Sequence, residues 1–299
     1  GGIMIGSWTD LSMLSDGSLS EIAAGAGPLP LAVSVDEEGG RVSRLSSLIG
    51  SQPSPRVLAR TSSPEEVRQI AADRGRQMRA MGITIDFAPV VDVTDAADNS
   101  VIGDRSFGSD PTVVTDFAGA YAQGLRDAGI LPVLKHFPGH GQASGDSHAE
   151  GVVTPPLDQL LDQDLVPYRT LTSAAPVGVM VGHMQVPGLT GSDPASLSPA
   201  AYALLRSGDY GGPPFAGPVF TDDLSSMRAI SDRFGVPDAV LRGLQAGADV
   251  ALWVTTAEVP AVLDRLEAAV AAGELTLPNV DASVQRVVAM KGPSPRCGG

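Results

Sequence analysis

Seven short runs of apolar, largely β-branched residues recur along this chain, and a longer segment separates most runs from the next. The runs are nearly continuous in hydrophobicity, as in "LPVLKHF" and "VGVMVGHM", which is typical of strands buried on both faces of a parallel sheet. The segments 63–82 and 111–129 begin at or beside a proline and end at a glycine, which predicts amphipathic helices. Alternating strands and helices predict an α/β fold with a parallel sheet. The predicted strands span residues 2–8, 30–36, 83–93, 131–137, 177–184, 218–224 and 249–254.

The number and order of these units favour a barrel over an open sheet. A (β/α)8 TIM barrel needs eight β-α units over roughly 250 residues, and we count seven in a chain that starts directly on a predicted strand. We therefore expect the first strand of the barrel to lie upstream of Gly1. An open doubly wound sheet usually carries a glycine-rich phosphate turn after its first strand, and this sequence has no GxGxxG or P-loop motif.

The chain organisation predicts one catalytic domain over residues 1–291 and a flexible Pro/Gly-rich tail over 292–299. Residues 185–217 are rich in Pro, Gly and Ser, and we interpret them as an excursion with one short helix rather than as a domain linker. Cys297 is the only cysteine, so no disulfide can form within the chain.

Charge and hydrophobicity restrict the partners. The chain has 299 residues, 43% of them hydrophobic, which is enough for a sizeable core. Its formal net charge of −14 argues against a nucleic acid or an anionic membrane as partner. No apolar run reaches the ~18 residues that a membrane span needs. A neutral or weakly charged ligand fits this chain best.

Ionisable residues follow five of the predicted strands at the point where each strand ends. In a barrel the carboxyl ends of all strands meet at one rim, and that rim carries the chemistry. Scattered surface residues would not cluster in this way, so the pattern predicts an active site at the rim. The residues are Asp36, Asp92, the pair Lys135 and His136, His183, and the pair Asp222 and Asp223.

Three of the four histidines lie in one stretch, "KHFPGHGQASGDSHAEG", residues 135–151. A metal site, an acid/base site and chance are the competing interpretations. The metal site is disfavoured because His136 and His140 flank an "FPG" turn, where an i, i+4 spacing has no helical meaning. By spacing alone, Asp146 and His148 are best interpreted as a solvated loop histidine with a local carboxylate.

Four motifs, taken together, are more specific than any of these patterns. "VDEEGGRVSRL", "IGDRSFG", "KHFPGHG" followed by "DSH", and "VFTDDLSSM" occur in this order. They resemble family 3 glycoside hydrolases, in particular the β-N-acetylglucosaminidase branch that acts on peptidoglycan fragments, and the wording is most similar to actinobacterial members. The resemblance covers residues 1 to about 291 and implies a (β/α)8 barrel. By resemblance to the single-domain members of the branch, we expect no second domain of the kind that many relatives carry.

The resemblance also implies roles for individual residues. Asp222, the first aspartate of "TDD", corresponds to the nucleophile, although period-two reasoning alone does not choose between it and Asp223, and both could cap a helix. His148 corresponds to the general acid/base and Asp146 to the carboxylate that orients it. His140 and His183 are expected to be structural. The implied sugar-binding residues are Asp36, Arg44, Arg105, Lys135 and His136, with structural salt bridges as the alternative for the two arginines.

We therefore predict a retaining exo-β-N-acetylglucosaminidase, a β-N-acetylhexosaminidase that removes terminal N-acetylglucosamine from peptidoglycan fragments. No cofactor and no metal are expected, and the protein is expected to be a monomer. The alternatives are a phosphorylase of the same family, a reaction in which the substrate acetamido group is the nucleophile, and a non-catalytic sugar-binding barrel. The resemblance implies an exported lipoprotein of the cell envelope, with a cytoplasmic location as the alternative. Trp8 and Trp253 lie in predicted strands and are expected in the core.

Overall fold

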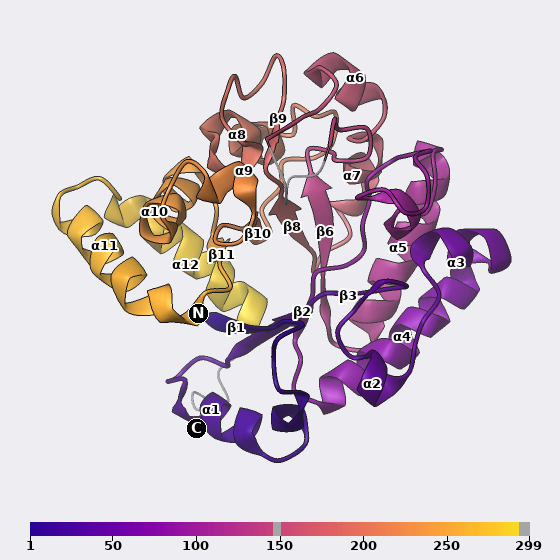
Figure 1. The fold of residues 1–299 in the computed structure, drawn as a ribbon, viewed down its shortest axis with the longest axis horizontal. Helices are drawn as coiled ribbons and strands as arrows, with labels where there is room; N and C mark the ends of the chain where they lie inside the picture. Colours follow the sequence, from indigo (N-terminus) through magenta and orange to yellow (C-terminus); the bar gives the residue numbers. More distant parts are fainter. Residues whose placement is uncertain (146–150, 293–299) are drawn as a thin grey trace.

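The computed structural model describes residues 1–145 and 151–292, and its centre is a seven-stranded sheet in which all neighbouring strands are parallel (Figure 1). The order of the strands in the sheet is also their order in the chain. Each strand therefore pairs with the next one along the sequence, which is the winding of a barrel rather than that of a doubly wound sheet. The strands are β1 (Gly2–Ile5), β2 (Ala32–Val35), β5 (Ile85–Asp86), β6 (Leu131–Phe137), β8 (Gly178–Val181), β10 (Val219–Asp223) and β11 (Val250–Leu252).

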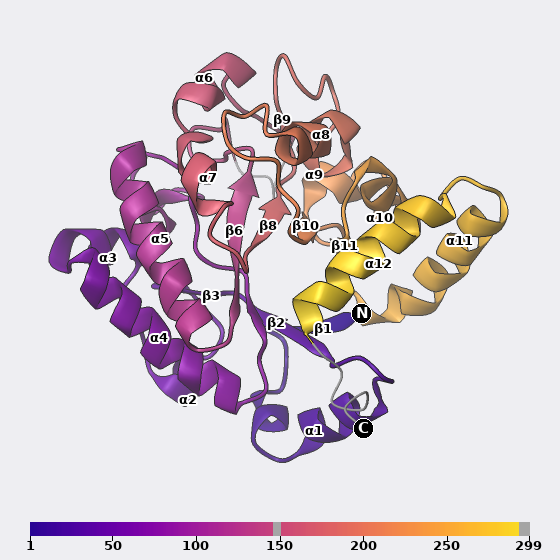
Figure 2. The same cartoon turned by 180° about the vertical axis from the view of Figure 1, so that it is seen from behind.

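Helices cover the outer face of this sheet. Figures 1 and 2 show α4 and α5 packed together on one flank and α10, α11 and α12 on the opposite flank. The helices are α1 (Ser18–Gly25), α2 (Ser46–Ile49), α3 (Pro55–Thr61), α4 (Pro64–Ala80), α5 (Pro111–Asp127), α6 (Leu157–Asp162), α7 (Val166–Leu171), α8 (Pro199–Ser207), α9 (Arg228–Ser231), α10 (Val236–Ala246), α11 (Val259–Ala271) and α12 (Leu277–Lys291). The predicted α/β fold with a parallel sheet is confirmed.

Local sequence signals account for the ends of the two predicted helices. Ser63 and Glu66 form a capping box before α4. The Ser63 hydroxyl accepts a hydrogen bond from the Glu66 N–H, and the Glu66 carboxylate accepts one from the Ser63 N–H. Asp110 accepts the Thr112 amide at 2.8 Å before α5. The predicted strand 83–93 is the least accurate prediction, because only β5 forms ladder pairs as a strand and Pro89, which has no N–H, lies in the segment after it.

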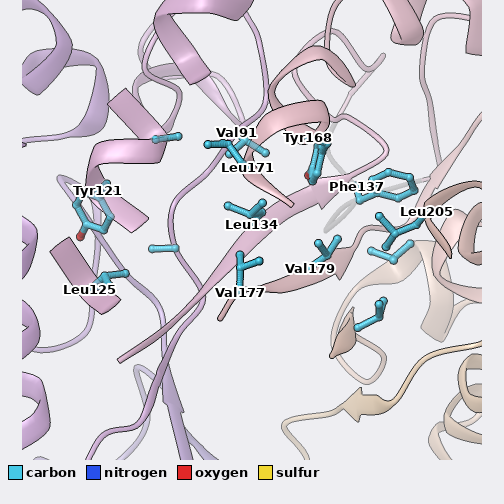
Figure 3. Close-up of a cluster of buried hydrophobic side chains, with 14 of the residues drawn as sticks. Val91, Tyr121, Leu125, Leu134, Phe137, Tyr168, Leu171, Val177, Val179 and Leu205 are labelled. Atoms are coloured by element: carbon cyan, nitrogen blue, oxygen red, sulfur yellow. The ribbon is translucent and has the colours of Figure 1, made fainter. Parts of the chain in front are cut away.

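Residues alternate between the two faces of the sheet and build two separate apolar clusters. The outer cluster lies between the strands and the helices, and it includes Leu134 and Phe137 of β6, Tyr121 of α5 and Tyr168 of α7 (Figure 3). The Phe137 and Tyr168 rings contact edge to face with centroids 5.2 Å apart. The inner cluster fills the concave face with Ala32, Ile85, Phe87, Leu131, Val133, Met180 and Phe220.

The two edge strands face a cavity. Among the described residues no ladder joins β1 to β11, and a cavity of about 320 Å³ is lined by both strands. The sheet is therefore a seven-stranded half-barrel. No helix in the described ranges is both long and apolar enough to cross a membrane.

The predicted core position of Trp8 is wrong. β1 ends at Ile5, so Trp8 lies in the turn beyond the strand, where it is 61% exposed and its indole covers Gly6. Trp253 follows β11 and packs, half-buried, against the apolar cluster around α10.

Two short pairs of strands lie outside the main sheet. β3 (Glu37–Gly39) pairs antiparallel with β4 (Val42–Ser43), and β7 (Val152–Val153) pairs parallel with β9 (Met184–Gln185). The excursion 185–217 contains α8 as its one α-helix, as predicted.

Candidate active site

The carboxyl ends of the strands surround a polar cavity of about 320 Å³. Its lining includes every predicted sugar-binding residue and the predicted nucleophile, which lie far apart in the sequence. The structure therefore brings together all six predicted site residues that it describes. The lining residues are Asp36, Glu38, Arg41, Val42, Arg44, Val101, Arg105, Lys135, His136 and Asp222.

A network of alternating charges forms one wall of this cavity. The Lys135 ammonium donates to Asp36 Oδ1 at 2.7 Å and lies 2.6 Å from Glu38 Oε1. Arg105 donates to both Glu38 oxygens, at 2.8 and 2.9 Å, in a bidentate pair. Burial by itself opposes the charge on Glu38, but Arg105 and Lys135 hold its pKa well below the ordinary value. Glu38 is therefore an anion between two cations, and these contacts fix the four side chains in place.

Sequence analysis missed Glu38, which links the two cations. In an extended strand, side chains alternate between opposite faces. Asp36 and Glu38 face the cavity, whereas Glu37 points the other way and accepts Arg74 Nε at 3.0 Å. The three consecutive acidic residues of "VDEEGG" carried this signal, since period-two reasoning places the first and third on the same side.

Asp92, noted only as a strand-end residue, fixes the orientation of His136. Its carboxylate lies 2.7 Å from His136 Nδ1 and accepts the backbone N–H groups of His136 and His140, at 3.2 and 2.8 Å. Burial opposes the charge of Asp92, but the two histidines lower its pKa below the ordinary value. Because an ionised carboxylate only accepts hydrogen bonds, Nδ1 of His136 carries a proton. His136 Nε2 then lies 3.4 Å from Arg105 Nη2 at the cavity wall.

Asp222 lies at the end of β10, where its carboxylate reaches two cavities. Burial alone would raise its pKa, but His183, His136, the Asp223 amide and Lys135 lower the pKa of Asp222 to about 2. The group is therefore an anion across the physiological pH range. Its Oδ1 accepts the Asp223 N–H at 2.8 Å, which fixes the side chain against its own strand. Such a carboxylate is suited to nucleophilic attack.

The second cavity, of about 230 Å³, has a partly apolar lining. It shares Asp36, Arg44 and Asp222 with the polar cavity. Its apolar residues are Met4, Trp8, Phe87, Met180, Met227, Leu252 and Val254. A ligand that touches Asp222 therefore meets paired charges on one side and apolar side chains on the other.

Asp146 and His148 lie outside the described residues. The stretch that leads to them is anchored in the interior. Asp164 is buried, and its Oδ1 accepts the N–H groups of Val93 and Gly141, at 3.4 and 3.3 Å. Gly139 lies directly against it, since a Cβ at this glycine would come within 2.3 Å of the Asp164 Cβ. Burial, followed by the nearby Asp92 charge, raises the pKa of Asp164 to about 7.

The raised pKa of Asp164 predicts a pH-dependent stability. The folded protein binds this proton between about pH 4 and pH 7, where the unfolded chain has already released it, so the free energy of unfolding falls as the pH rises through this window. Asp164→Asn removes the titration. We expect the stability of the variant relative to the parent to rise by up to about 4 kcal/mol from pH 4 to pH 8. Urea unfolding across this range measures the difference. The exposed Asp162→Asn is the control, and a flat difference for Asp164→Asn would contradict the prediction.

Comparison with known proteins places this chain in a family. The profile described as "Glycosyl hydrolase family 3 N terminal domain" matches residues 1–290. The β-hexosaminidase LpqI of Mycobacterium tuberculosis is 74% identical over 300 residues, which cover 100% of this chain and 77% of that protein.

Two solved structures share the fold over almost the whole chain. A crystal structure described as a glycosyl hydrolase of the GH3 family from Mycobacterium smegmatis has a TM-score of 0.97 at 78% identity, over 98% of this chain and 89% of that one. The structure of M. tuberculosis LpqI has a TM-score of 0.98 at 74% identity, over 99% of this chain and 87% of that one. The family predicted from the motifs is thus confirmed. The chain belongs to glycosyl hydrolase family 3 and, within it, to the β-hexosaminidases.

Proposed function

We propose that this protein is a retaining exo-β-N-acetylglucosaminidase that removes terminal N-acetylglucosamine from peptidoglycan fragments. The observation that carries the proposal is the position of Asp222. It is an ionised carboxylate at a strand end, and it lies where the polar cavity and the partly apolar cavity meet. The relatedness to β-hexosaminidases supports N-acetylglucosamine-containing substrates.

The two cavities suit the two kinds of group on this sugar. Hydroxyl groups of the pyranose form hydrogen bonds with Asp36, Arg44, Arg105, Lys135 and His136 in the polar cavity. Arg44 supports this assignment, because its buried Nε finds no acceptor among the described residues. The acetamido group at C2, next to the reacting carbon, enters the second cavity, where its methyl group contacts apolar side chains.

The reaction proceeds in two displacements at the anomeric carbon. Asp222 forms a bond to this carbon while the bond to the leaving oxygen breaks, and His148 gives that oxygen its proton. Water then attacks the same carbon, its proton passes to His148, and the bond to Asp222 breaks. Asp146 orients His148 and stabilises its protonated form. Two inversions give net retention, and the reaction as written requires neither a metal nor a cofactor.

The proposal has a structural and a cellular part as well. We propose that the half-barrel is the larger part of a closed (β/α)8 barrel, with an eighth strand between β1 and β11, and that residues 1–291 form one monomeric catalytic domain. The open cavity between the two edge strands supports the closed barrel. The resemblance to actinobacterial members supports an exported lipoprotein of the cell envelope, which cell fractionation tests.

Trapping the covalent intermediate tests the proposed mechanism. A 5-fluoro N-acetylglucosaminyl fluoride keeps the acetamido group and slows the release of the glycosyl-enzyme more than its formation. We expect one sugar adduct, and peptide mass analysis should locate it on Asp222. A catalytically active protein without an adduct on this peptide would instead favour acetamido participation. A protein that binds the sugar without turnover would be the non-catalytic barrel, and sugar 1-phosphate formed in phosphate buffer would identify a phosphorylase.

A further inference from the structure

His183 is a buried histidine that the proposed reaction does not use. It follows the end of β8, beside the end of β10, and is 1% exposed. Its Nε2 lies 2.8 Å from the backbone oxygen of Asp223, and its Nδ1 lies 2.6 Å from the Ser196 hydroxyl. Because a carbonyl oxygen only accepts, Nε2 carries a proton and donates to the Asp223 carbonyl, while Nδ1 and the Ser196 hydroxyl share a hydrogen bond. The imidazole therefore bridges two distant segments of the chain in one defined orientation.

The residue that His183 contacts also holds the proposed nucleophile. The N–H of Asp223 donates to Asp222 Oδ1 at 2.8 Å, while its C=O accepts from His183. The Asp223 carboxylate is fixed separately, because it accepts hydrogen bonds from both the backbone and the hydroxyl of Ser225 and of Ser226. His183 thus completes the set of hydrogen bonds around the strand end that carries Asp222.

Ser196 connects this strand end to the excursion 185–217. It lies in the 3-10 helix η3 (Ala195–Leu197) and is completely buried. Its N–H donates to Gly182 O at 2.9 Å, and its C=O accepts the Tyr202 hydroxyl at 2.8 Å. Both backbone groups are therefore anchored, and the Ser196 hydroxyl is held where it meets His183. A segment without a role in the proposed chemistry is thus rigidly joined to the site.

We propose that His183 and Ser196 are positioning residues, which hold the Asp222–Asp223 strand end so that the Asp222 carboxylate faces the anomeric carbon. This inference rests on the proposed role of Asp222 as nucleophile. Neither residue lines the two cavities that Asp222 reaches, so we expect their effect on the rate of attack and not on sugar binding. A displacement of about 1 Å at a reacting group lowers a rate about 10²-fold.

Two substitutions at His183 separate positioning from a general structural role. In His183→Gln the amide nitrogen replaces Nε2 and keeps the hydrogen bond to the Asp223 carbonyl. In His183→Asn the amide replaces Nδ1, so the contact with Ser196 is kept and the contact with Asp223 is lost. Thr172→Val is the matched control, because it removes a buried hydroxyl that bonds to the Tyr168 carbonyl and the Tyr210 hydroxyl, neither of which lies on β10.

The measurement is the rate constant for inactivation by the 5-fluoro N-acetylglucosaminyl fluoride, together with its binding constant. We expect His183→Asn to lower the inactivation rate constant about 10²-fold and His183→Gln to lower it only about tenfold. In both variants the binding constant should stay within about twofold of the parent value. Ser196→Ala should fall between them, and Thr172→Val should match the parent. Urea unfolding shows whether each variant is folded.

The outcomes distinguish this proposal from the proposed function. If the parent forms no adduct on Asp222, the proposed nucleophile is wrong. If the parent forms the adduct but the Asn and Gln variants are inactivated at equal rates, His183 is only structural and the positioning proposal is overturned. The proposal is also overturned if the inactivation rate of every variant, Thr172→Val included, decreases in proportion to its loss of stability.

Discussion

Asp222→Ala is expected to lower kcat/KM for a chromogenic N-acetylglucosaminide by about 10⁴-fold or more, because the covalent route is closed when the attacking carboxylate is lost. The KM should change far less, since we propose that the sugar hydroxyls bind to the charged cavity wall that Asp36, Lys135 and Arg105 form. Asp232→Ala, which removes an exposed carboxylate ten residues further along the chain, is the control and should keep the parent activity. Steady-state kinetics on both variants measures the difference.

Azide separates the loss of a nucleophile from a general loss of the site. The alanine leaves space below the anomeric carbon, and azide that enters this space attacks from the face that Asp222 occupied. We expect azide to restore turnover of a substrate with a good leaving group and to give the α-glycosyl azide, because a single displacement inverts a β-glycoside. A variant that keeps activity within about tenfold of the parent, or an azide product of β configuration, would contradict the assignment of Asp222.

The strands could be predicted well from the sequence because their hydrophobic pattern is local. β6 has the predicted bounds, and the ends of α4 and α5 lie within two residues of the predicted ends. All six candidate residues that the structure describes meet at one cavity, since the carboxyl ends of parallel strands converge on one rim. The predictions that were wrong concern positions whose structure depends on long-range contacts or on the backbone beyond a strand end. Trp8 is an example, because it lies past the last paired residue of β1.

The buried carboxylates were harder to predict, because their roles depend on partners that are distant in the sequence. Glu38 meets Arg105 and Lys135, and Asp164 meets the amides of Val93 and Gly141. The sequence alone indicates on which face of the strand Glu38 lies, but it does not identify the partners of Glu38. It gives no signal for Asp164, which follows α6 in a region without a strand. These residues support neighbouring groups through buried contacts, and only three-dimensional proximity identifies them.

Glu38→Gln tests whether this support matters for function. The amide has nearly the same shape as the carboxylate, but it removes the anion that Arg105 and Lys135 share. Breaking a buried ion pair on one side typically costs about 3–5 kcal/mol, because the remaining charges lose their partner in the interior. We expect a stability loss of about this size and, because both cations shift in the cavity wall, a decrease of about 10²-fold in kcat/KM, mainly through a higher KM.

A second buried ion pair provides the matched control for Glu38. Asp249 lies just before β11, at the opposite end of the strands from Asp222, and its side chain is fully buried against Arg206 at 2.6 Å. Asp249→Asn should therefore destabilise the protein by a similar amount and leave kcat/KM unchanged at a temperature where both variants are folded. If Glu38→Gln also keeps the parent kcat/KM while losing stability, then the charge network only supports the fold, and the cavity wall does not depend on Glu38 to hold the sugar.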